Sequence, residues 1–230
     1  MAKEMITVNM IARDSDDTIL PCLEAIMPFV SKVQVGIDSR SKDNTLSLVN
    51  ALAEEHPGKI EIELGMVSDP FVDLVRLRQS LLDKTYTRWV WIVDSDEYYP
   101  ADVALNILDR LDMNYSVYAL RCWAIWKRGL AHRSSSMAVI PRIFLNDERS
   151  WQGVFGKETL RNPGEEITLL PYRYIHLTHI KRDDWRGEMS QRRIADDKHL
   201  MVLPPEIDGE ISKIFRGAHV PEPRSYTPLG

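Results

Sequence analysis

A short apolar stretch, Trp89–Val93, runs directly into Asp94, Ser95, Asp96 and Glu97. An apolar run of this length between polar segments is typical of a buried strand. Burying three carboxylates together would be costly, so the end of this strand must meet water, a cation or both. In open α/β sheets, ligands bind beyond the carboxyl ends of the strands. The segment therefore predicts a buried strand whose end carries a polar site.

Strands and helices alternate through the first hundred residues. Alternating apolar positions predict strands, and apolar positions at helical spacing predict the helices between them. The expected strands before Trp89 are Met5–Ala12, Lys32–Asp38 and Lys59–Val67, and the expected helices are Thr18–Phe29, Thr45–Glu55 and Phe71–Lys84. This order predicts an α/β fold with a mostly parallel sheet and helices on both of its faces.

The second half of the chain changes character. Strands are expected at Ser116–Ile125 and Met137–Leu145, and further strands within Trp151–Leu160 and Ile167–Leu177. These segments predict a region of mixed β-structure. A charged helix is expected over residues 183–200. From Pro204 onward the chain is rich in Pro and Gly without a clear period, which predicts an irregular arm.

Composition limits the classes of function. The chain has 230 residues, a formal net charge of -5 and two cysteines. The negative charge argues against generic nucleic-acid binding, although a nucleic-acid acceptor stays open. Two cysteines do not imply a disulfide framework. We find neither a signal peptide nor a stretch long enough to span a bilayer, and we therefore expect a cytoplasmic protein.

Asp94 and Asp96 are two positions apart, so their side chains point to the same side if the segment is extended. Two carboxylates on one side suit a hard divalent cation that also holds a diphosphate. The alternative is an ordinary acidic turn at the end of a strand, with Pro100 stopping the segment.

Three segments resemble inverting glycosyltransferases of family 2, which have the GT-A fold. Ile6–Ile19 is similar to the family's opening strand and nucleotide-binding turn, and Asp38–Thr45 is similar to its loop rich in Asp, Ser and Thr. The helix with Arg78, followed by Asp94–Glu97, matches a third pattern, with Gln79 where the family has Asn. The resemblance implies a Rossmann-like GT-A sheet, with a nucleotide-sugar half at 1–100, an acceptor half at 101–180, and a C-terminal helix and arm at 181–230.

The resemblance also implies roles for particular residues. Asp96 and His176 would bind Mn²⁺ or Mg²⁺, with His179 a less suitable ligand than His176. An acceptor-only carboxylate such as Asp38 suits the N–H of a nucleobase, and Arg78, with Arg76 as a rival, can pair with phosphate. The residues implied to bind the donor are Ala12, Arg13, Asp38, Ser39, Arg78, Asp94 and Ser95.

The catalytic base is open between two glutamates. The segment from Trp151 to Leu160 is similar to a family segment that ends in His-Glu-x-Leu, and Glu158 falls on the family's Glu if Lys157 replaces the His. Glu158 could equally be a surface residue of a strand. Glu97 is the second candidate.

An aromatic and basic run either lines an acceptor site or combines core tryptophans with a solvated loop. It comprises Trp123, Trp126, Lys127, Arg128, His132 and Arg133.

The function expected from all these features is metal-dependent transfer of a sugar, with inversion, from a nucleoside diphosphate sugar to a hydroxyl acceptor. A UDP-sugar is the most plausible donor. The alternatives are a nucleotidyltransferase that makes nucleotide sugars, and a non-catalytic module that binds nucleotide sugars or glycans.

Overall fold

A computed structural model describes residues 5–66, 70–111, 114–127, 130–132, 136–147, 150–152, 159–161, 167–177 and 200–214. The strands are β1 (Ile6–Ala12), β2 (Lys32–Asp38), β3 (Ile60–Gly65), β4 (Trp89–Asp94), β5 (Glu97–Tyr98), β6 (Val117–Lys127), β7 (Leu130–His132), β8 (Ile140–Leu145), β9 (Ser150–Gln152), β10 (Thr159–Arg161), β11 (Ile167–His176) and β12 (Leu200–Val202). The helices are α1 (Ile19–Ile26), α2 (Thr45–Glu55), α3 (Pro70–Asp83), α4 (Ala101–Leu108) and α7 (Pro205–Ile214), with a 3₁₀ turn at Met27–Phe29.

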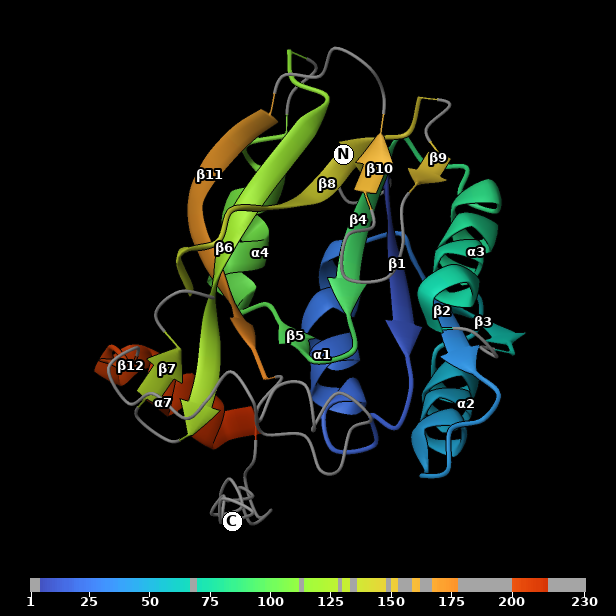
Figure 1. The fold of residues 1–230 in the computed structure, drawn as a ribbon, viewed down its shortest axis with the longest axis horizontal. Helices are drawn as coiled ribbons and strands as arrows, with labels where there is room; N and C mark the ends of the chain where they lie inside the picture. Colours follow the sequence, from blue (N-terminus) through green and yellow to red (C-terminus); the bar gives the residue numbers. More distant parts are fainter. Residues whose placement is uncertain are drawn as a thin grey trace, which may run out of the picture.

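The first four long strands form the parallel half of the main sheet, in the order β4-β1-β2-β3. β1 is buried along its whole length and pairs in parallel with β2 and β4. Strands covered on both faces read as continuous apolar runs, which explains the composition of Ile6–Ala12 and Trp89–Val93. Parallel pairing brings the carboxyl ends of β1, β2 and β4 to one edge of the sheet, at the bottom of Figure 1.

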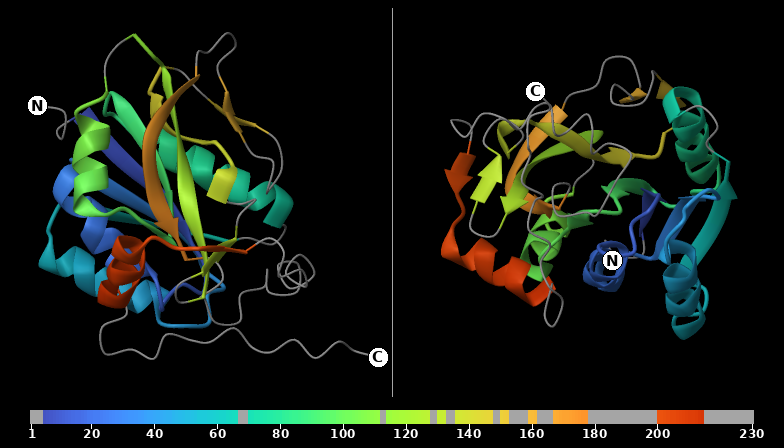
Figure 2. Two further views of the ribbon diagram at one scale, coloured as in Figure 1. Left: turned by 90° about the vertical axis from the view of Figure 1, so that its left-hand side faces the viewer. Right: turned by 60° about the horizontal axis from the view of Figure 1, so that its bottom comes forward.

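Helices cover both faces of the sheet. The left view of Figure 2 shows α1, α2 and α4 on one side of the strands and α3 on the other. The larger apolar core lies under the first group, while Leu74, Leu77 and Leu81 of α3 pack on Ile11 of β1. A Cβ atom at Gly36 of β2 would lie 2.9 Å from Leu77, so the close approach of α3 requires glycine at this position.

The second half continues the same sheet with mixed pairing. β8 runs antiparallel to β4 and β6, and β11 runs parallel to β6. The last two residues of β11 also pair with β5, so Ile175 faces Tyr98 and His176 faces Glu97. This pairing carries the end of β11 to the acidic end of β4. The expected α/β fold, with a mostly parallel sheet followed by mixed β-structure, is confirmed.

Some details differ from expectation. The prediction of an irregular arm from Pro204 is wrong for residues 205–214, which form α7. Ile207, Ile211 and Ile214 supply its apolar face, and Gly209 within the helix obscured that period. Leu200 begins strand β12 rather than ending a helix. Helix α4 and strand β5 were not anticipated, and the expected helix over residues 183–199 lies outside the described residues.

Among the described strands, β3 pairs with β2 alone and is therefore the outer strand on one side of the sheet. Its two glutamates are held by lysines of neighbouring elements. Glu61 pairs with Lys32 at 2.5 Å, and Glu63 pairs with Lys84 at 2.8 Å. Both cysteines are buried and reduced. Within the described ranges, no helix combines the length and the apolar character needed to cross a membrane.

Candidate active site

The loops that follow β1 and β4 are joined by hydroxyl groups. The Oγ atoms of Ser15 and Ser95 lie 2.8 Å apart, and Thr18 Oγ1 donates to the carbonyl oxygen of Ser95 at 2.9 Å. The Ser15 N–H also donates to Thr45 Oγ1, at the start of α2, at 2.7 Å. Of these residues, Ser95 was expected to bind the donor, while Ser15, Thr18 and Thr45 lie within the first two segments that resemble the family. Small hydroxyl residues beside the ends of parallel strands were the available signal.

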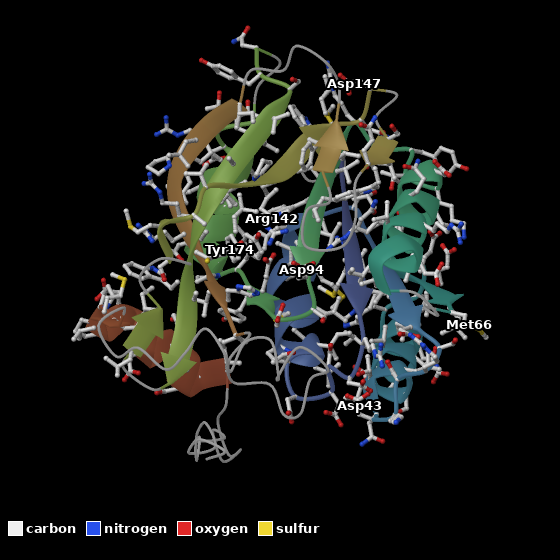
Figure 3. The ribbon with its side chains drawn as sticks, in the orientation of Figure 1. Asp43, Met66, Asp94, Arg142, Asp147 and Tyr174 are labelled. Atoms are coloured by element: carbon white, nitrogen blue, oxygen red, sulfur yellow. The ribbon has the colours of Figure 1, made fainter. Side chains whose placement is uncertain are left out.

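Carboxylates join the loop after β1 to the loop after β2. Asp14 accepts a hydrogen bond from the Lys42 N–H at 2.7 Å, and Asp43 accepts one from the Asp16 N–H at 2.8 Å. Asp14 has a φ of 44°, an uncommon conformation for a residue with a side chain. Asp43 lies at the lower end of the molecule in Figure 3. The ends of β1, β2 and β4 therefore form one hydrogen-bonded platform.

Asp38, the expected nucleobase contact, is buried at the end of β2 and engaged by two arginines. Arg13 Nη1 lies 3.4 Å from Asp38 Oδ2. Arg40 donates to the same carboxylate from its backbone N–H at 3.0 Å and from its guanidinium at 3.3 Å. The neighbouring expected residues differ in exposure, because Ser39 is exposed and Ala12 is buried in β1. The structure thus brings Asp38 and Arg13 together, with Arg40 as an additional partner.

Asp94 lies between two arginines at the end of β4. Its Oδ1 is 2.7 Å from Arg78 of α3, and its Oδ2 is 3.4 Å from Arg142 of β8. Burial alone would raise the pKa of Asp94, but the two guanidinium groups hold it well below its usual range. Figure 3 shows Asp94, Arg142 and Tyr174 close together in the middle of the molecule. Asp94 is therefore an ionised anchor for both arginines.

Arg78 also contacts the β9 strand. Its guanidinium lies over the Trp151 ring, 5.1 Å from the ring centroid. The next residue of α3, Gln79, accepts a hydrogen bond through its side-chain oxygen from the backbone N–H of Trp151, at 2.8 Å. Gln79 stands where the family pattern has Asn, and here it ties α3 to β9.

Glu97 is fully buried and faces inward from β5. It pairs with Arg142 and accepts the backbone N–H of Asp94 at 3.1 Å. Arg142 Nη2 lies 3.2 Å from the hydroxyl of Tyr174 as well. Burial raises the pKa of Glu97 to about 7, against the opposing effect of Arg142. This enclosure gives Glu97 a positioning role toward Asp94 and Arg142.

The raised pKa of Glu97 predicts a pH dependence of stability. The pKa is near 4.5 in the unfolded chain and about 7 in the folded protein. A carboxyl whose pKa rises on folding contributes stability below its unfolded pKa, and that stability is lost as pH rises through the folded value. In metal-free buffer we expect the free energy of unfolding to fall between about pH 5 and about pH 8, by about 3 kcal/mol at most. Urea unfolding across this range measures it.

Glu97→Gln is the matched control for this pH dependence. The variant lacks the titrating carboxyl, so its stability should fall less over the same pH range. The raised pKa of His176 contributes in the same direction at higher pH and is present in both proteins. Equal slopes for the two proteins would show that Glu97 does not titrate in this window.

Asp96 and His176 face each other across the junction of β5 and β11. His176 Nε2 lies 3.5 Å from Asp96 Oδ1, and the Leu177 N–H donates to the Asp96 carbonyl at 2.8 Å. Burial alone would lower the pKa of His176, but the Asp96 carboxylate raises it well above its usual value. The expected same-side orientation of Asp94 and Asp96 was conditional on an extended segment, and that condition is not met, because the strand ends at Asp94 and the chain turns at Ser95–Asp96.

The Asp96–His176 pair fits a divalent cation. Two ligand atoms of one cation, each about 2.1 Å from it, lie about 3 Å apart, close to the observed 3.5 Å. A carboxylate suits Mg²⁺ and Mn²⁺, and an imidazole ligand favours the transition metal of the two. The described residues hold no group of three acidic, His or Cys side chains at metal-binding spacing. The remaining ligands would then come from water or from a bound diphosphate.

Two expected residues lie outside the described residues. Glu158 directly precedes β10, which pairs antiparallel with β9 through Thr159 and Gln152. His179 follows the end of β11 in the sequence. His176, the preferred metal ligand of the two histidines in the sequence, contacts Asp96.

Comparison with known proteins finds similarity at the level of structure. No protein-family model and no curated protein matches the sequence. The crystal structure of S. aureus TarS 1–349 superposes with a TM-score of 0.52 and 13% identity, over 91% of this chain and 70% of that chain. S. aureus TarS 1–349 in complex with UDP-GlcNAc gives a TM-score of 0.52 and 16% identity, over 94% and 68% of the two chains. At this identity the likeness establishes the fold, and the chain has an α/β fold of the GT-A type.

Proposed function

We propose that this protein is a glycosyltransferase that moves a sugar, with inversion, from a UDP-sugar to a hydroxyl acceptor. The observation that carries the proposal is the set Asp38, Asp94, Asp96 and His176 at neighbouring strand ends of a GT-A type sheet. The UDP-GlcNAc complex of the structurally similar TarS supports a uridine nucleotide as the donor.

The platform formed by the loops after β1, β2 and β4 would hold the nucleotide. Asp38 would accept the N–H of the base, and Arg13 and Arg40 at its sides would donate to neighbouring carbonyl oxygens of that base. Uracil presents such an N–H between two carbonyl groups, whereas cytosine lacks the N–H. A uracil base therefore suits this arrangement of donors and acceptors better than cytosine does.

Asp96 and His176 would hold Mn²⁺ or Mg²⁺. The cation, when bound, would neutralise charge on the departing diphosphate as a Lewis acid. Arg142 and Glu97 keep the end of β4 in place by fixing Asp94, so that Asp96 follows at a defined position. Because Glu97 is enclosed, we propose Glu158 as the base that receives the proton of the acceptor hydroxyl. The acceptor oxygen would bond to the anomeric carbon as the bond to the diphosphate oxygen breaks.

A thermal-shift screen tests the donor class. In the presence of Mn²⁺, UDP and UDP-sugars at about 100 times Kd should stabilise the protein by about 2.7 kcal/mol, which for a chain of this size corresponds to roughly 5–10 °C in Tm. GDP and CMP provide the comparison. A shift limited to uridine nucleotides, together with release of UDP when an acceptor is added, supports the proposal. Binding without transfer or hydrolysis would identify a non-catalytic module, and absence of any nucleotide effect would refute the donor site.

A further inference from the structure

Two arginines and a tryptophan lie together on β6 and β11. Arg121 of β6 pairs in register with Arg173 of β11, and Trp123 pairs with Ile175. The Arg173 guanidinium lies over the Trp123 ring, 4.5 Å from its centroid. We call Arg121, Trp123 and Arg173 the β6–β11 basic cluster.

The positive charge of the β6–β11 basic cluster is not balanced within the described part of the chain. Arg173 donates to the carbonyl oxygens of Cys122 and Ser136, at 3.1 Å and 2.6 Å, but pairs with no described carboxylate. Arg121 Nε is buried and has no hydrogen-bond partner among the described residues. Burial and the neighbouring Arg121 both lower the pKa of Arg173. A buried donor without a partner is costly, so an anion at this point would stabilise the cluster.

The β6–β11 basic cluster shares a sheet face with part of the candidate active site. Arg121 alternates with the core residues Leu120 and Cys122 and therefore points to the opposite face, while Trp123 packs in part against that core. On the face of Arg121, Val117 lies four positions earlier and packs in the apolar group that includes Trp151. Trp151 in turn lies beneath Arg78. Along β11, Arg173 precedes His176 by three residues, about 10 Å, and this odd spacing places their side chains on opposite faces of the strand.

We propose that the β6–β11 basic cluster binds a phosphate or carboxylate group carried by the acceptor. Arginine forks pair with the oxygens of both groups. The chain has a net charge of -5, which repels anions overall. A local positive site would therefore direct an anionic acceptor to one place on the protein. That the anion is carried by an acceptor rests on the proposed function. The anion site itself rests on the contacts of the β6–β11 basic cluster.

Binding of a soluble linear polyphosphate tests the cluster directly. Isothermal titration is carried out on the full chain in metal-free buffer containing EDTA, at constant ionic strength set with NaCl. We expect Arg121→Gln to weaken polyphosphate binding at least about tenfold, because one charge-assisted contact is lost. Arg110→Gln removes the same charge from an exposed position after α4 and should bind like the wild type. Arg173→Lys keeps the charge without the fork and should weaken binding to an intermediate degree.

Several outcomes separate this proposal from its alternatives. Equal polyphosphate affinities of the wild type and Arg121→Gln would overturn the proposal. The same binding signal from NaCl in place of polyphosphate would also overturn it. Co-sedimentation with phosphatidylglycerol vesicles, without binding of the soluble polyphosphate, would also overturn it in favour of a lipid surface. An unchanged Tm of Arg121→Gln, without ligand, shows that the variant is folded. If polyphosphate binding is lost in Arg121→Gln but uridine nucleotides bind neither protein, the anion site stands and the proposed function fails.

Discussion

Arg142→Met is expected to lower the free energy of unfolding by about 3–5 kcal/mol, because removing one partner of a buried ion pair leaves an uncompensated buried charge. Arg142 is 8% exposed and contacts Asp94, Glu97 and Tyr174. Asp94 keeps Arg78 as a partner in the variant, but Glu97 loses Arg142, the cationic side chain that contacts it directly among the described residues. Urea unfolding of the wild type and the variant at about pH 8, where Glu97 is ionised, measures the difference.

The same physical argument predicts how the effect can be reduced. At about pH 5 Glu97 can take up a proton, so the loss caused by Arg142→Met should be smaller than at about pH 8. The double variant Arg142→Met/Glu97→Gln should recover part of the loss for the same reason. Arg76→Met removes an arginine from the exposed pair with Asp73 and should change stability by no more than about 1 kcal/mol. A loss for Arg142→Met no larger than that of Arg76→Met would show that the buried network contributes little.

Asp96→Asn is expected to remove the Mn²⁺-dependent part of UDP binding, with a loss of affinity of about 100-fold or more. The substitution keeps the size of the side chain and replaces a carboxylate oxygen by an amide. Calorimetric titration of UDP with and without Mn²⁺ measures the effect. Asp109→Asn, at the exposed end of α4, removes an equal charge and should leave the Mn²⁺ dependence unchanged.

A second readout does not depend on the donor. The Asp96 carboxylate raises the pKa of His176, so Asp96→Asn should lower that pKa, which NMR titration of the imidazole can follow. If the pKa of His176 falls while Mn²⁺ dependence persists, the pair is structural and the metal site lies elsewhere. If neither changes, the contact between Asp96 and His176 is not maintained in solution.

The first half of the fold could be predicted from the sequence because its signals are local. The expected strand Lys32–Asp38 and the expected helix Thr45–Glu55 agree with β2 and α2 residue for residue. Helix α4 is only eight residues long, which leaves too few turns for a clear apolar period. The dual pairing of β11 with β6 and β5 joins segments far apart in sequence, and no local pattern encodes it.

The candidate site was predictable where a strand ends in polar residues, and less so where partners come from distant segments. Asp38, Asp94 and Asp96 follow directly from the ends of β2 and β4. Arg142 was missed, although a charged residue inside the apolar stretch Ile140–Leu145 signals a buried anion nearby. Arg40 was present within the expected loop, but its contact with Asp38 depends on the conformation of the loop.

The outer position of β3 has a consequence for how this protein behaves at high concentration. An unpaired strand at the margin of a sheet offers backbone groups on which another molecule's strand can assemble, and charged side chains discourage such growth. Lys32 lowers the pKa of Glu61, and Lys84 with Ser80 outweighs burial to lower that of Glu63, so both glutamates stay charged in more acidic solution than free glutamate would. The charges on β3 therefore disfavour fibre-like association through this edge strand over a wide range of pH.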